Sequence, residues 1–176
     1  MKKIILTVLF FASVNLFAQK AGWDEEKAKQ NITTQSALMA KAFIEADYKT
    51  FAAFTYPVIL KAMGGTAKLT QTLTKTVDEM KEQGLSFNNI SFDPPSKIVK
   101  SGKELQATIA QHTEVKMRRG RVVTTSTIIA FSTDNGNIWT FVDTSSNDMY
   151  MLRKLIPGIS KNIIVPSPSK PVRLND

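Results

Sequence analysis

The order of the sequence patterns along the chain constrains its fold more than any single motif does. Apolar residues recur at helical spacing from Asp24 to Gln83, and alternating strand patterns follow from Leu85 to Asp143. Helices that precede a run of antiparallel strands favour an α+β fold, in which the helices gather on one face of the sheet. What that face encloses then decides what such a protein binds.

The first residues have the pattern of a secretory signal peptide. Lys2 and Lys3 precede an apolar run, residues 4–11, and a site with a small residue ends at Ala18. The apolar run is shorter than the ~20 residues that a transmembrane helix needs. We therefore expect residues 1–18 to be a signal peptide cleaved after Ala18, and the product to be periplasmic or secreted with no membrane span.

The amino-acid composition excludes several kinds of functional site. The chain has no cysteine, which excludes disulfides, thiolate nucleophiles, Cys-based metal sites and a lipoprotein anchor. The formal net charge is +8, but the Lys and Arg residues are scattered among Asp and Glu, which is typical of a solvated surface and not of a nucleic-acid site. At 43% hydrophobic residues, we expect one domain, residues 19–157, and a loosely ordered tail, residues 158–176, that contains three prolines.

Capping residues mark the helices. We expect three helical segments, with a short turn at Pro57 that the Gly64-Gly65 pair ends, because glycine adopts the left-handed conformation of a helix C-terminus. The predicted N-caps are Asp24, Asp47 and Thr66, for residues 24–46, 48–55 and 66–84.

Turn residues divide the second half into strands. Pro94 stops a short strand around Ile90, and another begins at Ile98. The predicted longer strands are residues 104–117, 121–133 and 137–143, joined by the hairpin loops Arg118-Arg119-Gly120 and Asp134-Asn135-Gly136. A short segment follows at residues 149–155.

Loop length predicts the strand register. Three-residue loops place Met117 opposite Arg121 and Thr133 opposite Asn137. The helix-facing side would then carry the apolar residues Leu105, Ala107, Ile109, Val115, Val123, Ile129, Phe131, Trp139 and Phe141. A polar band on the same side would be formed by Gln111, Thr127 and Asp143, with Thr113 and Thr125 beside it.

Two interpretations of this band stay open. It can line a cavity with Asp143 as the ionisable member. Polar side chains on an apolar face need hydrogen-bond partners or water, because each unpaired buried polar group lowers stability by ~1 to 3 kcal/mol. Alternatively, threonine is an ordinary strand residue, and Asp143 caps the next loop or emerges at the sheet edge. A two-residue Asn135-Gly136 turn would shift the register by one residue and turn Asp143 outward.

The opposite side of the predicted sheet has an apolar patch formed by Ile128, Ile138 and Val142. Two covers fit it equally well. One is a second copy of the chain, in a homodimer through the sheet, and the other is the apolar C-terminal segment, residues 163–165.

With these features, the chain resembles the nuclear transport factor 2-like superfamily, also called the cystatin-like cone. The matching features are the helical first half, the Tyr56-Pro57 break and long hairpins that end in Trp139-Thr140-Phe141-Val142-Asp143. More narrowly, it looks like exported bacterial members of unassigned function. The resemblance implies N-terminal helices packed on the concave face of a strongly bent antiparallel sheet, a cavity between them and frequent dimerisation. Enzymes of this shape use a cavity carboxylate as base with a tyrosine or histidine partner.

Other chemistry has little support. His112 is the only histidine and falls in the solvent-facing register, so no His-rich metal site is expected. Arg118, Arg119 and Arg121 could hold an anion, but such charges more often protect a hairpin tip from aggregation. Phosphate-binding loops, dinucleotide fingerprints and nucleic-acid motifs are missing from the sequence, so we expect no cofactor, no metal and no nucleic acid.

The sequence therefore predicts an exported, non-catalytic binding or interaction module with a small apolar-walled cavity. Its ligand would be a small apolar or amphipathic molecule. The alternative is an isomerase, lyase or dehydratase in which Asp143 is the base and Tyr56 a hydrogen-bond donor. The expected ligand-binding residues are Tyr56, Gln111, Thr113, Thr125, Thr127, Trp139 and Asp143.

Overall fold

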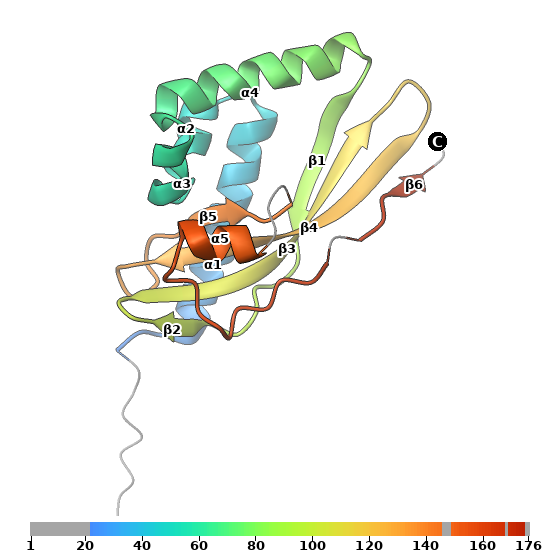
Figure 1. Cartoon of the computed structure of the whole chain (residues 1–176). Coiled ribbons are helices and arrows are strands. Elements are labelled where there is room, and N and C mark those ends of the chain that lie inside the picture. Colours follow the sequence, from blue (N-terminus) through green and yellow to red (C-terminus); the bar gives the residue numbers. More distant parts are fainter. Residues whose placement is uncertain (1–21, 146–148, 168, 175–176) are drawn as a thin grey trace, which may run out of the picture.

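The computed structural model describes residues 22–145, 149–167 and 169–174, and shows an α+β fold with the helices first (Figure 1). The predicted signal peptide, residues 1–18, lies outside this part of the chain. Among the described residues, no helix combines the length and the apolar character needed to cross a membrane. The helices of the first half are α1 (Glu25–Ile44), α2 (Tyr48–Ala53), α3 (Pro57–Ala62) and α4 (Gly65–Glu82).

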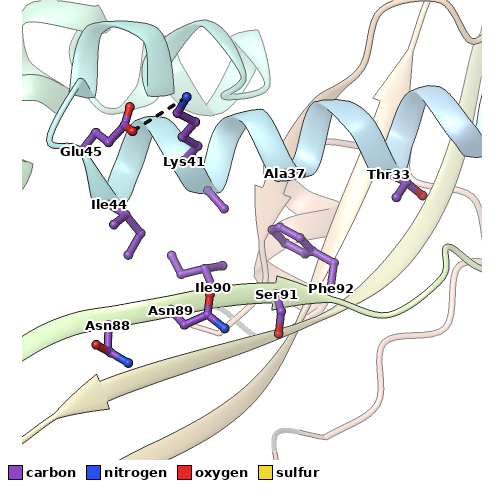
Figure 2. Close-up of a pocket in the computed structure, with 11 residues that line it drawn as sticks. Thr33, Ala37, Lys41, Ile44, Glu45, Asn88, Asn89, Ile90, Ser91 and Phe92 are labelled. Atoms are coloured by element: carbon purple, nitrogen blue, oxygen red, sulfur yellow. Dashed lines mark ion pairs between the residues drawn. The ribbon is translucent and has the colours of Figure 1, made fainter.

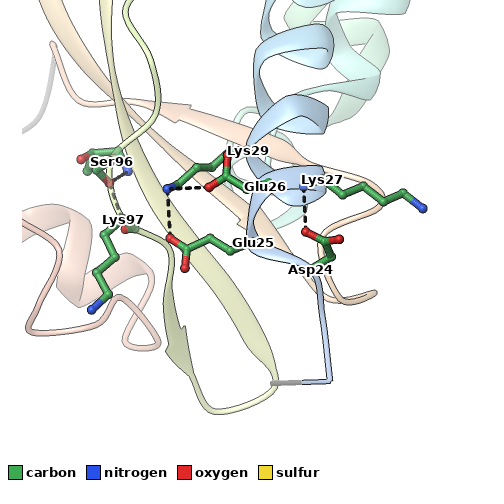
Figure 3. A network of polar contacts seen from close by, with 8 residues as sticks. Asp24, Glu25, Glu26, Lys27, Lys29, Ser96 and Lys97 are labelled. Atoms are coloured by element: carbon green, nitrogen blue, oxygen red, sulfur yellow. Dashed lines mark hydrogen bonds and ion pairs between the residues drawn. The ribbon is translucent and has the colours of Figure 1, made fainter. Parts of the chain in front are cut away.

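Aspartates begin the first two helices, as predicted. The Asp24 carboxylate accepts the backbone N–H of Lys27 at 3.1 Å, and Asp47 accepts that of Thr50 at 3.1 Å. These side chains satisfy N–H groups that have no partner inside the helix. In the first turn of α1, Lys29 also pairs with Glu25 at 3.1 Å (Figure 3).

The start of α4 differs from the prediction. The helix begins at Gly65, and its N-cap is Gly64, which has a φ of +88°. The prediction that Thr66 caps this helix is therefore wrong. Glycine takes the capping position because the backbone there is left-handed, a conformation that glycine adopts without the strain that a Cβ atom causes.

A strongly curled antiparallel sheet follows the helices. Its strand order is β1-β3-β4-β5, with β2 paired to β3 and β6 paired to β4. A further helix, α5 (Met149–Leu155), lies between β5 and β6. The strands are β1 (Ser86–Phe92), β2 (Val99–Ser101), β3 (Glu104–Lys116), β4 (Arg121–Ser132), β5 (Thr140–Asp143) and β6 (Val172–Leu174).

The predicted register between β3 and β4 is wrong by one residue. Lys116 pairs with Arg121 across the two strands, so the loop contains four residues, Met117 to Gly120, where three were expected. Side chains alternate across a sheet, so this single residue moves every β4 side chain to the other face. Ile128 consequently faces the helices, and Ile129 and Phe131 face away from them.

The register between β4 and β5 also differs by one residue, and it matches the alternative that a shorter turn predicted. Phe131 is the cross-strand partner of Thr140, and Ile128 is the partner of Asp143. The connection is nevertheless longer than a tight hairpin, because the Asp134 carboxylate accepts the Ile138 N–H at 2.9 Å and holds a wide turn. The two shifts cancel on β5, so Trp139 and Phe141 face the helices as predicted.

One core lies between the sheet and α1. Ile32 on α1 is fully buried, and Trp139 is 1% exposed and donates its indole N–H to the Gly136 carbonyl at 3.0 Å. Other members of this core are Ala28, Met39, Ile98, Leu105, Ala107, Ile109, Ile128, Ala130 and Phe141.

A second core lies on the opposite face of the sheet, where α5 and the C-terminal segment cover it. Ile129, Phe131 and Val142 pack there against buried residues of the later chain, which are Leu152, Ile156, Ile159 and Ile163. Of the two predicted covers, the C-terminal segment is the one that occupies this face. The predicted patch itself is split, since Ile128 faces the helices and Ile138 is 67% exposed.

Polar contacts fasten the C-terminal segment. Gln106 is fully buried, donates to the Gly158 carbonyl at 2.9 Å and accepts the Ser160 N–H at 2.9 Å. Arg153 of α5 donates to the carbonyls of Ile159 and Ser160, at 2.7 and 3.0 Å. The domain boundary at residue 157 stays a prediction, but the residues directly after it are anchored on the sheet.

Candidate functional site

A groove of about 470 Å³ runs between α1 and β1 (Figure 2). It is partly open to solvent. It is lined from α1 and the residue after it by Thr33, Ala37, Ala40, Lys41, Ile44 and Glu45, and from β1 by Asn88, Asn89, Ile90, Ser91 and Phe92.

The shape of the groove follows from its lining. Five consecutive residues of β1 contribute, although neighbours on a strand point to opposite faces. The groove therefore follows the backbone edge of the strand as well as one of its faces. On α1 the lining runs from Thr33 to Glu45, which is ~18 Å at 1.5 Å per residue.

Apolar side chains form the walls. Figure 2 shows Ile44 pointing from α1 toward β1, and Ile90 and Phe92 pointing from β1 toward α1. Ala37 leaves space between them because it has only a methyl group. The one ion pair of the lining, Lys41 with Glu45 at 3.9 Å, lies on exposed side chains and contributes little free energy.

Aromatic contacts hold α1 and β1 together next to the groove. The rings of Phe43 on α1 and Phe87 on β1 meet edge to face, with centroids 4.9 Å apart. Phe43 also contacts the ring of Phe51 on α2, at 5.4 Å. These ring contacts, together with that of Phe43 and Tyr48 at 5.9 Å, hold the helix against the strand next to the groove.

The sequence-predicted site residues lie elsewhere. None of the seven lines this groove in the described part of the chain. Trp139 is buried in the core beneath α1. Asp143 is exposed at the sheet edge, where its carboxylate accepts the Ser145 N–H at 2.8 Å, which is the loop-capping interpretation of that residue.

The predicted polar band is not formed. The cross-strand partner of Gln111 is Ser126, that of Thr127 is Ala110, and that of Asp143 is Ile128. The band depended on three-residue hairpin loops, and the extra residue in the β3–β4 loop moved Thr125 and Thr127 to the opposite face. Only Gln111 and Thr113 stay together, with a hydrogen bond of 3.2 Å along β3.

The corrected register brings Thr125 together with two polar residues that were not predicted as site residues, His112 and Asp93. His112 lies directly opposite Thr125, and its Nδ1 is 3.0 Å from the Thr125 hydroxyl. Its Nε2 is 3.0 Å from the Asp93 carboxylate. Sequence reasoning missed this cluster because it placed Thr113, and not His112, opposite Thr125. The cluster links β3 and β4 to the end of β1 on the face away from the helices.

Tyr56 belongs to the second core. Its ring stacks on Phe131, with centroids 4.3 Å apart, and its hydroxyl donates to Glu104 at 2.9 Å. Burial, followed by the Glu104 contact, raises the pKa of Tyr56 to about 12. The enzymatic alternative required Asp143 inside a cavity with Tyr56 as donor, whereas Asp143 is exposed and Tyr56 is engaged with Glu104.

A spacing signal for the groove was present in the sequence. Thr33, Ala37 and Lys41 recur every four residues and share one face of α1. Their small and polar character gave no apolar stripe, so the pattern was not distinguished from a solvated helix face. Among the described residues, no three His, Cys, Asp or Glu side chains gather to hold a metal ion.

Neither a family model, nor a curated protein, nor a solved structure matches this chain. The class of protein is therefore defined by its architecture alone, which is an α+β fold with a curled antiparallel sheet and an open groove beside α1.

Proposed function

We propose that this protein is an exported, non-catalytic binding module and that the groove between α1 and β1 holds its ligand. The observation that carries the proposal is the groove itself. Its apolar walls stand open to solvent between a long helix and an edge strand, and no described side chain fills it.

The arrangement of polar groups supports binding over catalysis. The groove is lined by amides, hydroxyls and one exposed ion pair, which can orient a ligand. The only histidine is held by Thr125 and Asp93 on the face of the sheet away from α1. A general base in the groove would have to be Glu45, which is exposed and paired with Lys41.

Two further parts of the proposal rest wholly or partly on the sequence. Export rests on the N-terminal pattern that ends at Ala18, and N-terminal sequencing of the mature protein tests it. Membership of the nuclear transport factor 2-like superfamily rests on the helices-first order and the curled sheet.

The test is a titration with 1-N-phenylnaphthylamine, an uncharged apolar dye that fluoresces when it leaves water. An uncharged dye is needed because the basic protein, with a formal net charge of +8 that falls to +6 when Lys2 and Lys3 are removed with the signal peptide, would attract an anionic one. We expect saturable binding to the native protein and a loss of about tenfold or more in affinity for Ala37→Phe, which fills the groove. Leu38→Phe is the matched control, since Leu38 is 50% exposed and does not line the groove.

Equal affinities for the native protein and Ala37→Phe would place the dye elsewhere and reject the groove as the binding site. An absence of any saturable binding would reject it as well.

A further inference from the structure

The two sides of the sheet differ in how their edges are covered. On the β5 side, the Phe141 N–H donates to the Phe54 carbonyl at 2.7 Å, and the Tyr56 N–H donates to the Phe141 carbonyl at 3.0 Å. Along the same side of β4, β6 covers the end that begins at Arg121, and the Thr144 N–H donates to the Thr127 carbonyl at 3.1 Å. On this side, the outward backbone groups of Phe141 and of residues 121–123 are therefore paired by the chain itself, and the strand left outermost beside β4 is the three-residue β6.

The strand β1 lies on the other side and pairs only with β3 within the described ranges. Natural edge strands are usually protected by shortness, charge or proline. The edge strands β2 and β6 have three residues each and carry Lys100 and Arg173. By contrast, β1 has seven residues and no charged residue or proline, and a bulge near Asn89 is its one protective feature.

The backbone N–H and C=O groups of β1 that do not pair with β3 point away from it, at the strand edge that the groove follows. The Asp93 N–H donates to the Ala110 carbonyl at 3.0 Å, so Asp93 is oriented toward β3. Orientation alternates along an antiparallel strand, so Ser91 also points toward β3, and Ile90 and Phe92 point their N–H and C=O groups away from it. Ile90 and Phe92 are the two residues of β1 whose side chains form the apolar wall (Figure 2).

We propose, on the basis of the function proposed above, that the ligand is an extended polypeptide segment of another protein, which adds to β1 as an antiparallel strand. Its backbone would pair with Ile90 and Phe92. Every second side chain, small and apolar, would enter the groove against Ala37 and Ile44. The uncharged strand and the balanced Lys41–Glu45 pair suit a segment without charged residues.

The dimensions of the groove favour a strand over a compact molecule. A five-residue strand is ~17 Å long, close to the ~18 Å that the groove spans on α1. The chain also shows that this sheet takes up extended segments, since the tail residues Val172–Leu174 add to the edge of β4 as β6.

The test uses a capped peptide of alternating valine and threonine, with a lysine at each end for solubility. We expect saturable changes in the amide spectrum of the ¹⁵N-labelled protein at Ile90, Phe92 and the groove face of α1. The Ile90 and Phe92 amides should also exchange with solvent more slowly in the complex than in the free protein, because they gain hydrogen-bond acceptors.

Backbone methylation separates strand addition from apolar contact. In an antiparallel pair, the valines that face the groove also present their N–H groups to β1. N-methylation of two valines should therefore weaken binding about tenfold, whereas N-methylation of two threonines should leave it nearly unchanged. Ala37→Phe should weaken binding to a similar degree, and Leu38→Phe should not.

Equal effects of the two methylation patterns, or an absence of saturable binding up to about 1 mM peptide, would overturn the peptide proposal. Slow exchange of the Ile90 and Phe92 amides in the free protein that depends on protein concentration would assign the edge to a second copy and also overturn it. If the uncharged dye still binds and Ala37→Phe still abolishes that binding, the proposed function stands and only the peptide partner is lost.

Discussion

Gly136 shows at the scale of one residue why α1 can lie so close to the β4–β5 connection. Its φ is +85°, and a Cβ atom there would lie 2.7 Å from the Cβ atom of Ala28. Both the backbone conformation and the space therefore require glycine.

Gly136→Ala should lower the free energy of unfolding by about 2–4 kcal/mol, as measured by urea denaturation. Gly65→Ala is the control, because Gly65 has a similar φ of +83° but no atom within 4 Å of the added Cβ. An equal loss in both variants would mean that backbone strain alone explains the effect and that the contact with Ala28 does not contribute.

Because of Tyr56, we expect the stability of the protein to depend on pH in the alkaline range. Its pKa in the folded protein is raised to about 12, above the ~10 of an unfolded tyrosine, so folding favours the protonated hydroxyl. The stabilisation is complete below pH ~10 and is lost as the pH rises through ~12.

The free energy of unfolding should therefore fall between pH ~10 and ~12, and Tyr56→Phe should remove that part of the decrease. Tyr150→Phe provides the comparison, because Tyr150 is 74% exposed. If both substitutions flatten the curve equally, the burial of the Tyr56 hydroxyl and its contact with Glu104 are not the source of the decrease.

At the scale of elements, local signals were sufficient for the starts of α1 and α2, but not for the start of α4 or for the strand register. Asp24 and Asp47 cap their helices as predicted, because a cap needs only the next three residues. The inward-facing residues of β3 were also predicted correctly. Those of β4 were not, because the face of β4 depends on the length of one loop.

The candidate site depended on that same register. A single extra residue before Arg121 separated Gln111 from Thr127 and brought His112 opposite Thr125. The groove was not predicted, because it depends on the distance between α1 and β1. That distance is set by ring contacts such as Phe43 with Phe87, which pattern analysis does not give.

Arg153 links one element, α5, to the segment after it. The guanidinium donates to the Ile159, Ser160 and Ile163 carbonyls, and charge-assisted hydrogen bonds are among the stronger ones. Arg153→Ala should lower the free energy of unfolding by about 1–3 kcal/mol and increase the rate of amide exchange of residues 159–163.

Lys154→Ala is the matched control, since Lys154 is exposed on the same helix. Unchanged exchange rates in Arg153→Ala would show that the segment is held without Arg153, by Gln106 and the buried isoleucines.

For the whole molecule, the sheet separates two cores that are built from different parts of the chain. The helices of the first half cover one face, and the last residues cover the other. A chain cut after residue 157 loses the buried side chains of Ile159 and Ile163, each worth ~1.5–3 kcal/mol.

This truncation should therefore lower the free energy of unfolding by about 3–6 kcal/mol and expose Phe131 and Val142. A chain cut after residue 167 keeps both isoleucines and should lose less. If the two truncated proteins are equally stable, the segment contributes nothing and the loosely ordered tail expected from its prolines is the better description.

The uneven covering of the sheet edges also sets how far this protein can assemble. Open sheets polymerise when both of their ends accept a new strand, and each added molecule then presents a fresh end. Here the end opposite β1 is covered in part by residues 54–56 and in part by β6, a three-residue edge strand that carries Arg173, so it is a poor template for a further molecule. We therefore expect association through β1 to stop after one partner, which would let the protein keep an uncharged edge strand without forming fibres.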